Sequence, residues 1–290
     1  MLIVAAYISV VLIWTTTPLA IVWGGSGDWF FAVALRTTLA ALLILPFAFW
    51  FGVHKRWSFK PSVLKIYLFA ALPIFGGMTA MYWAGQSLPS GWIALLFALN
   101  PIFSGVLAHY LLPNYQLNGL KILAILISLC GLVVIFAPNL SMHLATIQLL
   151  AIGAAFLSVF FHSLGSVLIK RCGTHLSSLD VVVAALLVSS ATYLLLSPTQ
   201  LFDVENYLRL SERAMAAIVY AAVIGSLIGF VLFFYLVRHV DAMKVALIPV
   251  ITPVFAILLG HFLNDEPLGW DVWFGVTLVL AGLVLFQRQK

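Results

Sequence analysis

The stretch ALLFALNPIFSGVLAH occupies residues Ala94–His109, and the stretch ALIPVITPVFAILLGH occupies residues Ala246–His261, 152 positions later. Both open with Ala-Leu, carry Pro-x-Phe in the middle and close with Leu-x-His at the same spacing. The same offset pairs Asp28 with Asp180, Pro46 with Pro198 and Gly77 with Gly229, and a slip of one residue pairs Gly131–Val133 with Gly282–Val284. The sequence therefore indicates an internal duplication that covers most of the chain.

The composition of the chain excludes a water-soluble globule. Of its 290 residues 64% are hydrophobic and only 8% are charged, and the mean hydropathy is +1.15. Soluble domains carry about 25% charged residues. A membrane-spanning helix needs about 20 apolar residues, and ten stretches near that length are centred about Ile13, Ala40, Ile74, Leu99, Ile127, Phe156, Leu187, Ile224, Val254 and Leu280.

The net charge of +5 is an orientation signal, and we expect no nucleic-acid partner. Eleven Lys and Arg residues fall at connections of one parity or at the C-terminus, and only Arg209 and Arg213 fall at the other. This positive-inside pattern predicts that both termini are cytoplasmic and that the loops with Asp265 and Glu266 are external. Leu2–Trp23 has no preceding Lys or Arg, and no cleavage pattern follows it, so we expect a retained helix.

The predicted fold is an all-α integral membrane protein with ten transmembrane helices in two inverted five-helix repeats. Five spans are an odd number, so the second repeat begins on the opposite side of the membrane from the first. Residues 1–143 are expected to form the first repeat and residues 144–290 the second. Internal duplication in a membrane protein is typical of transporters whose substrate site lies between the repeats.

Three segments resemble the EamA repeat of the drug/metabolite transporter superfamily. They are the run from Tyr82-Trp83 through Leu88-Pro89-Ser90-Gly91 to Asn100-Pro101, the run Arg36-x-x-Leu39-Ala40-Ala41, and Gly131-Leu132-Val133. The resemblance extends over essentially the full length. It implies a ten-helix fold and movement of small metabolites across a bacterial inner membrane, frequently as export of amino acids or toxic amphiphiles.

Two prolines in repeat-equivalent positions are candidates for the substrate site. Asn100-Pro101 and Thr252-Pro253 lie in the middle of the fourth and ninth expected helices. A proline lacks an N–H and displaces the carbonyl four residues back, and a freed carbonyl in a membrane must be satisfied by protein, water or a ligand. The pair predicts either compensated kinks or bends that line a transport cavity and act as rocking points.

Aromatic residues at helical spacing form a second candidate group. Met78 and Tyr82 lie one turn apart in the third helix, and their equivalents Phe230 and Phe234 do so in the eighth. They are either packing residues or an uncharged wall for an aromatic or amphipathic substrate. Trp14 and Thr15, in a Trp-Thr-Thr-Thr run of the first helix, add a polar-aromatic patch, whose threonines can also bond to their own helix.

Arg36 and His162 are the polar candidates at membrane depth. Arg36 lies about two turns inside the second helix, where a charge costs about 2.5–3.5 kcal/mol on insertion scales. It is either tied to backbone carbonyls or extended outward to the membrane surface, or it is a counter-ion for a substrate carboxylate. His162 is either a packing residue or a proton relay.

Acidic residues are missing from the middle of all ten apolar runs. Proton-coupled antiporters usually carry a membrane carboxylate, so this sequence favours facilitated diffusion, exchange, or weak coupling through His162. Cys130 and Cys172 imply neither a disulfide nor a metal site. No nucleotide-binding loop occurs, and no cofactor is expected.

The sequence as a whole predicts a secondary transporter of small metabolites, such as amino acids or aromatic and amphipathic compounds, that works by alternating access. A lipid flippase or a channel is the alternative. An intramembrane enzyme is disfavoured because membrane depth offers one His and one Arg as reactive groups. The expected partners are a small-molecule substrate and membrane lipid, in a monomer or a homodimer.

Overall fold

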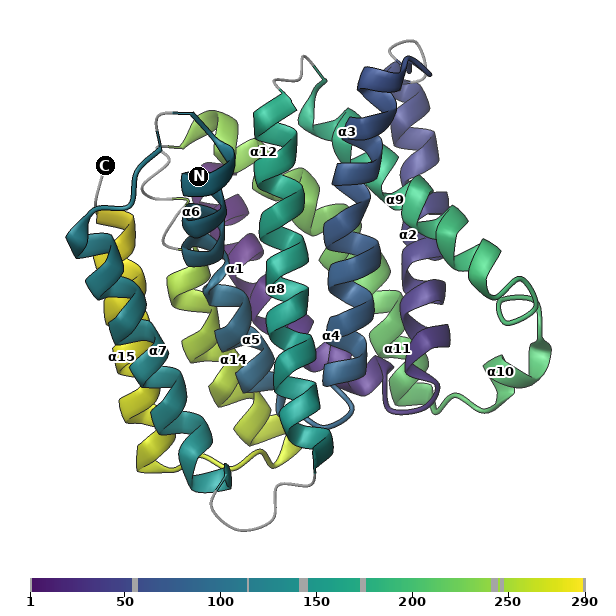
Figure 1. The fold of residues 1–290 in the computed structure, drawn as a ribbon. Helices are drawn as coiled ribbons and strands as arrows, with labels where there is room; N and C mark the ends of the chain where they lie inside the picture. Colours follow the sequence, from purple (N-terminus) through teal and green to yellow (C-terminus); the bar gives the residue numbers. More distant parts are fainter. Residues whose placement is uncertain are drawn as a thin grey trace.

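The computed structural model describes residues 2–53, 57–113, 115–140, 146–172, 176–240, 245 and 248–288, without the side chains of 136–140, 178, 230, 234, 237 and 238. The regular structure in this part of the chain is helical (Figure 1). The first repeat contributes α1 (Leu2–Gly24), α2 (Trp29–Trp50), α3 (Pro61–Ala71), the π-helical turn η2 (Leu72–Gly77), α4 (Met78–Ala84), α5 (Ser90–Ala98), α6 (Asn100–Leu111) and α7 (Gly119–Leu140). The second contributes α8 (Thr146–Cys172), α9 (Ser178–Leu196), α10 (Val204–Leu208), α11 (Glu212–Tyr220), the π-helical turn η3 (Ala221–Ile228), α12 (Gly229–His239), α14 (Ile248–Asn264) and α15 (Trp270–Arg288).

Eight helical segments of the described chain are long and apolar enough to cross a membrane. Two shorter apolar helices, Gly119–Ile135 and Ile248–Asn264, coincide with the fifth and ninth expected spans. The third expected span is the continuous run from α3 through η2 to α4, and the eighth is the run from α11 through η3 to α12. The chain is therefore a multi-pass membrane protein.

The paired aspartates of the two repeats both start a helix. Asp28 precedes α2, and its Oδ1 accepts hydrogen bonds from Phe30 N at 2.9 Å and Phe31 N at 3.0 Å. Asp180 lies in the first turn of α9 and forms a capping box with Ser177, whose backbone N–H donates to Asp180 Oδ2 at 2.8 Å. A carboxylate at this place satisfies N–H groups that have no partner within the helix, so the duplication preserves a helix start.

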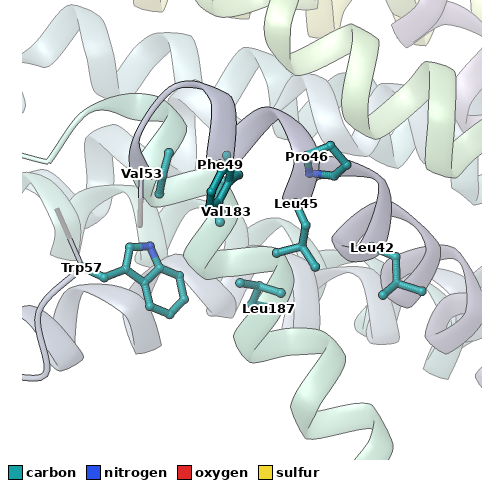
Figure 2. Close-up of a pocket in the computed structure, with 9 residues that line it drawn as sticks. Leu42, Leu45, Pro46, Phe49, Val53, Trp57, Val183 and Leu187 are labelled. Atoms are coloured by element: carbon teal, nitrogen blue, oxygen red, sulfur yellow. The ribbon is translucent and has the colours of Figure 1, made fainter. Parts of the chain in front are cut away.

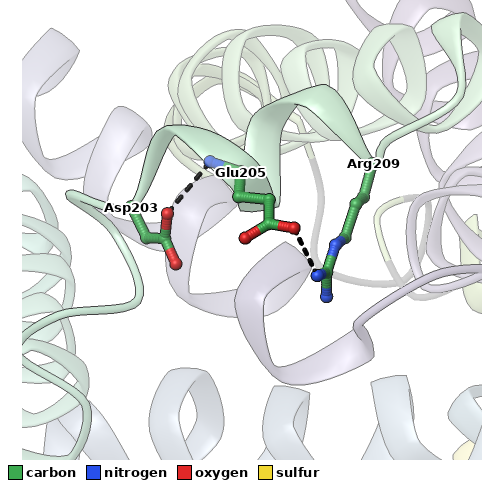
Figure 3. Close-up of polar contacts among 3 residues, drawn as sticks. All are labelled: Asp203, Glu205 and Arg209. Carbon is green, nitrogen blue, oxygen red and sulfur yellow. Dashed lines mark hydrogen bonds and ion pairs between the residues drawn. The ribbon is translucent and has the colours of Figure 1, made fainter.

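The ends of the molecule can be named from Figure 1. We call the upper end the one at which α1 begins and α15 ends. The connection from α1 to α2 and the connection from α14 to α15 lie at the opposite, lower end. The short helix α10 projects at the lower right, where Asp203 caps it and Glu205 pairs with Arg209 at 2.6 Å (Figure 3). That ion pair is exposed, so it contributes little to stability.

Each repeat gives its first helix to the helices of the other repeat. α1 packs against α11, η3, α12 and α14, and we call this group the α1 bundle. α8 packs against α3, η2, α4 and α6, and we call this group the α8 bundle. The sequence predicts two five-helix halves, but the packing units of the structure exchange α1 and α8 between those halves.

The remaining helices pair across the repeats in the same way. α7 and α15 close-pack along their length, and α2 packs against α9. α5 continues into α6 of the α8 bundle, yet it packs mainly against α14 and α1 at the lower end. This helix therefore joins the two bundles.

Candidate functional site

Two π-helical turns interrupt repeat-related helices at corresponding positions. η2 separates α3 from α4, and η3 separates α11 from α12. The 152-residue offset places Leu72–Gly77 on Ile224–Gly229, so the two turns overlap in the repeat. A π turn has hydrogen bonds between residues five apart, so it interrupts the regular α-helical ladder, and such turns are frequent at functional sites. The third and eighth spans are therefore a repeat-related pair in which both members are interrupted by a π turn.

Arg36 reaches from α2 to α4, which follows the first π turn, and to the second π turn, η3. Its Nη1 lies 3.8 Å from Met78 Sδ and 3.5 Å from the Tyr82 hydroxyl, both just beyond η2. Its Nη2 lies 3.5 Å from Ser226 Oγ in η3. The guanidinium carbon also stands 5.8 Å from the centre of the Tyr82 ring. One cation thus touches both repeats.

These contacts leave the charge of Arg36 without an anionic partner. Arg36 is 6% exposed and Tyr82 is fully buried. The three contacts are long for hydrogen bonds and involve neutral side chains. Within the described residues no carboxylate lies within 4 Å of the guanidinium, and none of its hydrogen bonds goes to a backbone carbonyl. Of the interpretations of Arg36, the tie to carbonyls finds no hydrogen bond in this part of the structure.

His162 packs directly on the first π turn. Its Nδ1 is 2.9 Å from Ser158 O, one turn earlier in α8, and its ring meets Phe97 edge-on at 5.2 Å. A Cβ at Gly77 would collide with the imidazole. Glycine is therefore what allows α8 to approach η2 so closely, and His162 fills the space that it leaves.

The prolines of the fourth and ninth spans act differently. The fourth span is divided at Leu99, with Asn100 and Pro101 opening α6. Ser163 Oγ donates to Asn100 Oδ1 at 2.8 Å and lies 3.2 Å from Asn100 O, so α8 supplies a polar partner at the break. In the ninth span α14 is continuous through Pro253, and both Thr252 and Pro253 are buried. Of the two repeat-equivalent prolines, Pro101 therefore lies at a break in its span, whereas Pro253 lies within a continuous helix.

The polar-aromatic patch of the first helix faces the eighth span. Trp14 packs on Phe233 with ring centres 4.8 Å apart, and the Thr16 hydroxyl is 2.5 Å from the Tyr220 hydroxyl. The Thr15 hydroxyl is buried and lacks a hydrogen-bond partner in the described structure. The side chains of Phe230 and Phe234, which the sequence places opposite Met78 and Tyr82, lie outside the described part of the chain.

Hydrogen bonds and tight packing join the two bundles at the lower end. The Gln86 side-chain amide, in the connection from α4 to α5, donates to Gly25 O after α1. The Glu266 carboxylate, beyond α14, accepts from Ser90 N at 2.7 Å and Gly91 N at 3.1 Å at the start of α5. Sequence reasoning missed these contacts and placed Glu266 only in an external loop. The glycines on both sides of the contact were the available signal.

A cavity of about 560 Å³ lies elsewhere, between α2 and α9 near the upper end (Figure 2). It is lined by apolar residues, among them Leu42, Pro46, Trp57, Val183 and Leu187. None of the twelve residues proposed from the sequence for substrate contact lines it. Its lining is apolar, and it offers no charged group to a polar metabolite.

The chain matches one family model twice. The model of the EamA-like transporter family matches residues 1–137 and again residues 149–287. These two matches together cover nearly the whole chain, and the gap between them falls near the predicted boundary of the repeats.

Curated relatives carry the same kind of description. The chain is 26% identical to the uncharacterized transporter YvbV of Bacillus subtilis over 59% of this chain and 54% of that protein. It is 22% identical to the uncharacterized transporter YoaV of Bacillus subtilis over 82% of each chain. An uncharacterized transporter of Archaeoglobus fulgidus is 23% identical over 89% of this chain and 86% of its own length. The match thus spans about half of YvbV and most of the other two.

A solved structure described only as "Crystal structure of protein" has the same fold. It superposes with a TM-score of 0.64 over 99% of this chain and 97% of its own, at 19% sequence identity. At that identity the likeness concerns the fold alone.

Proposed function

The chain belongs to the EamA-like transporter family, and we propose that it is a secondary transporter whose substrate is a small metabolite carrying a carboxylate, such as an amino acid. The proposed substrate site is centred on Arg36 between the two π turns. Tyr82, Met78 and Ser226 form its described surroundings. Trp14 and His162 flank these turns on α1 and α8, so they complete the proposed neighbourhood.

The observation that carries this proposal is the isolated charge of Arg36. A buried cation normally has a paired anion, because transfer of a lone charge out of water is costly. A substrate carboxylate would form two parallel hydrogen bonds with the guanidinium, which is the strongest neutral-pH pairing available to it. The adjacent sulfur and aromatic ring favour a substrate with an apolar or aromatic side chain.

The packing supports alternating access by the two exchanged bundles. The two bundles are joined at the lower end by α5, which leads into α6 of the α8 bundle but packs on α14 and α1. α6 itself packs mainly on α8. If the bundles rock about Arg36, opening the lower end requires the α5 contacts to part. We propose that the lower end is external, that both termini are cytoplasmic and that the membrane is a bacterial inner membrane, in line with the charge pattern.

Transport by the purified protein in liposomes tests the proposed substrate class. We expect carboxylate-bearing amino acids to enter at least about tenfold faster than the amines that lack the carboxylate, because the amines cannot pair with Arg36. The matched pair of an aromatic amino acid and its decarboxylated amine isolates the one group in question. Equal rates for the two members, or a preference for aromatic cations, would reject the assignment.

A further inference from the structure

The two ends of the Arg36 guanidinium face different surroundings. Nη1 lies 3.8 Å from Met78 Sδ and 3.5 Å from the Tyr82 hydroxyl on α4, so this end meets a sulfur and an aromatic residue. Nη2 lies 3.5 Å from Ser226 Oγ in η3, on which α1 and α2 both pack. Gly225 precedes Ser226 in the same π turn and is buried. The polar side of the proposed substrate site is therefore where Nη2 meets η3 and α1.

Gly225 leaves space beside Nη2. A Cβ added at Gly225 would lie 3.5 Å from Thr17 Oγ1 on α1 and 3.8 Å from Arg36 Nη2, with no further contact within 4 Å in the described structure outside the adjoining backbone. These are ordinary contact distances. At Gly77, by contrast, a Cβ would collide with the His162 ring. Close helix packing thus explains the glycine at position 77 but not the one at position 225, where the missing side chain keeps a hydroxyl and a guanidinium open to a small group.

The two hydroxyls at this space have only acceptor capacity left. Thr17 Oγ1 donates its proton to Ile13 O at 2.7 Å, and Ser226 Oγ donates its proton to Ala221 O at 3.0 Å. A hydroxyl has one O–H and two lone pairs. Ser226 Oγ accepts one long hydrogen bond from Arg36 Nη2, whereas no group of the described structure donates to Thr17 Oγ1. The complementary ligand group is therefore a hydrogen-bond donor.

An ammonium matches these acceptors better than a hydroxyl does. An ammonium has three N–H donors and no lone pair. A substrate hydroxyl would bring lone pairs of its own, and the guanidinium, the described donor at this place, is already paired with the carboxylate in the proposed complex. In an α-amino acid the ammonium stands on the carbon next to the carboxylate, so one small ligand reaches both Thr17 Oγ1 and Arg36 Nη2. Its carboxylate also offsets the second positive charge.

We propose that Thr17 and Gly225 form an ammonium subsite beside Arg36, and that the substrate is a zwitterionic α-amino acid with a free amino group. Thr17 Oγ1 accepts a hydrogen bond from the ammonium, Ser226 Oγ is a second acceptor, and Gly225 leaves the room that the group needs. Met78 and Tyr82, at the Nη1 end, remain for the side chain of the substrate. This inference rests on the proposed pairing of Arg36 with a carboxylate, to which it adds the second charged group of the ligand.

Equilibrium binding of matched compounds to the purified full-length protein tests the subsite. Binding is measured in detergent, because a deaminated acid can cross a lipid bilayer without the transporter. The standard amino acid that binds most tightly is compared with the acid that lacks its amino group and the amine that lacks its carboxylate; for phenylalanine these are 3-phenylpropanoate and phenethylamine. We expect the amino acid to bind at least about tenfold more tightly than the deaminated acid, because removal of a charged donor leaves the Thr17 acceptor unpaired.

Thr17→Val removes the acceptor and keeps a branched side chain. The ratio of the two dissociation constants, deaminated acid to amino acid, should fall toward one in this variant, which a purely structural defect would not cause. Thr277→Val on α15 is the matched control, because Thr277 Oγ1 makes the same kind of hydrogen bond, to Trp273 O at 2.8 Å, on an exposed face. The ratio should stay unchanged in the control.

Gly225→Ala tests the space itself. The added methyl group makes ordinary contacts with Thr17 and Arg36, and alanine favours a helix over glycine, so the melting temperature should be unchanged or higher. Amino-acid binding should nevertheless weaken at least about tenfold, because the methyl group takes the place of the ammonium. Unchanged affinity in Gly225→Ala would overturn the placement of the ammonium at this glycine.

The comparison of compounds separates failure of this inference from failure of the proposed function. Equal affinity for the amino acid and its deaminated acid in the unmodified protein overturns the ammonium subsite and leaves the carboxylate assignment standing, and this result needs no variant to fold. A ratio that persists in Thr17→Val overturns the role of Thr17. Equal affinity for the amino acid and its amine contradicts the pairing with Arg36, and absence of binding by every standard amino acid contradicts the substrate class as well as this inference.

Discussion

Arg36→Gln is expected to lower the rate of carboxylate transport by about a hundredfold or more. The glutamine keeps a hydrogen-bond donor but removes the charge and the two-pronged geometry. Loss of a charge-assisted hydrogen bond costs about 1.5–3 kcal/mol, and a hundredfold corresponds to about 2.7 kcal/mol. Initial uptake rates in liposomes, together with equilibrium binding of the same substrate, measure the effect.

Stability separates loss of binding from loss of fold in this variant. Arg36 is buried without an anionic partner among the described residues, so its removal should leave the melting temperature unchanged or raise it. Arg209→Gln removes a guanidinium from an exposed ion pair and serves as the matched control, with transport unchanged. Near-normal transport by Arg36→Gln would show that the carboxylate does not bind there.

Gly131→Leu is expected to destabilise the protein by about 3 kcal/mol, because overpacking forces backbone shifts. α7 and α15 meet through glycines, and a Cβ at Gly131 would stand 2.6 Å from Gly275 O and 2.8 Å from Val279 N. Both atoms belong to the backbone of α15, so a side-chain rotation cannot relieve the clash. Thermal unfolding in detergent and the yield of monodisperse protein report the loss.

Gly153→Leu is the matched control for that experiment. Gly153 is an exposed residue of α8 with nothing within 4 Å of an added Cβ. Its replacement should be neutral or stabilising by up to about 1 kcal/mol, because glycine disfavours the helix. Equal melting temperatures for the two variants would show that α7 and α15 do not pack as closely as the structure has them.

The sequence predicts much of the architecture, because the repeat and the hydropathy can be recognised from short stretches of sequence. The repeat pairs Asp28 with Asp180, and both lie at a helix start in the structure, while the Asn100-Pro101 step, expected to bend the fourth span, lies at the break between α5 and α6. The apolar runs coincide with eight candidate spans and two shorter helices in the described residues. Each of these features depends on residues close to one another in the chain.

Other features depend on contacts between distant segments, so no local pattern shows them. The exchange of α1 and α8 leaves hydropathy unchanged, since a helix is equally apolar beside either repeat. Pro253 stands in the same Pro-x-Phe pattern as Pro101, yet α14 stays continuous while the fourth span divides. From the sequence, Glu266 is an acidic residue of an external loop, and only the fold shows its contact with the start of α5.

The two π turns could not be predicted for a similar reason. Their sequences, LPIFGG and AAVIGSLI, share a glycine near the middle of a span, and only the first contains proline. Their surroundings also differ, because His162 presses on Gly77 of the first turn, whereas a Cβ at Gly225 of the second turn would lie 3.5 Å from Thr17 Oγ1 and 3.8 Å from Arg36 Nη2. The contacts of Arg36 depend on the same packing, because α2 lies against both α4 and η3 and so brings Met78 and Ser226 to one guanidinium.

The exchange of α1 and α8 between the repeats determines the order in which the helices can pack during synthesis. A nascent chain that has inserted residues up to Leu140 holds α3, α4 and α6 without α8, the helix on which they pack. These spans have small and polar positions, including Gly77 and Asn100, that would then face lipid or the insertion machinery. They can assemble only after the ribosome has released residues up to Cys172, while α1 must wait for α14, close to the end of translation.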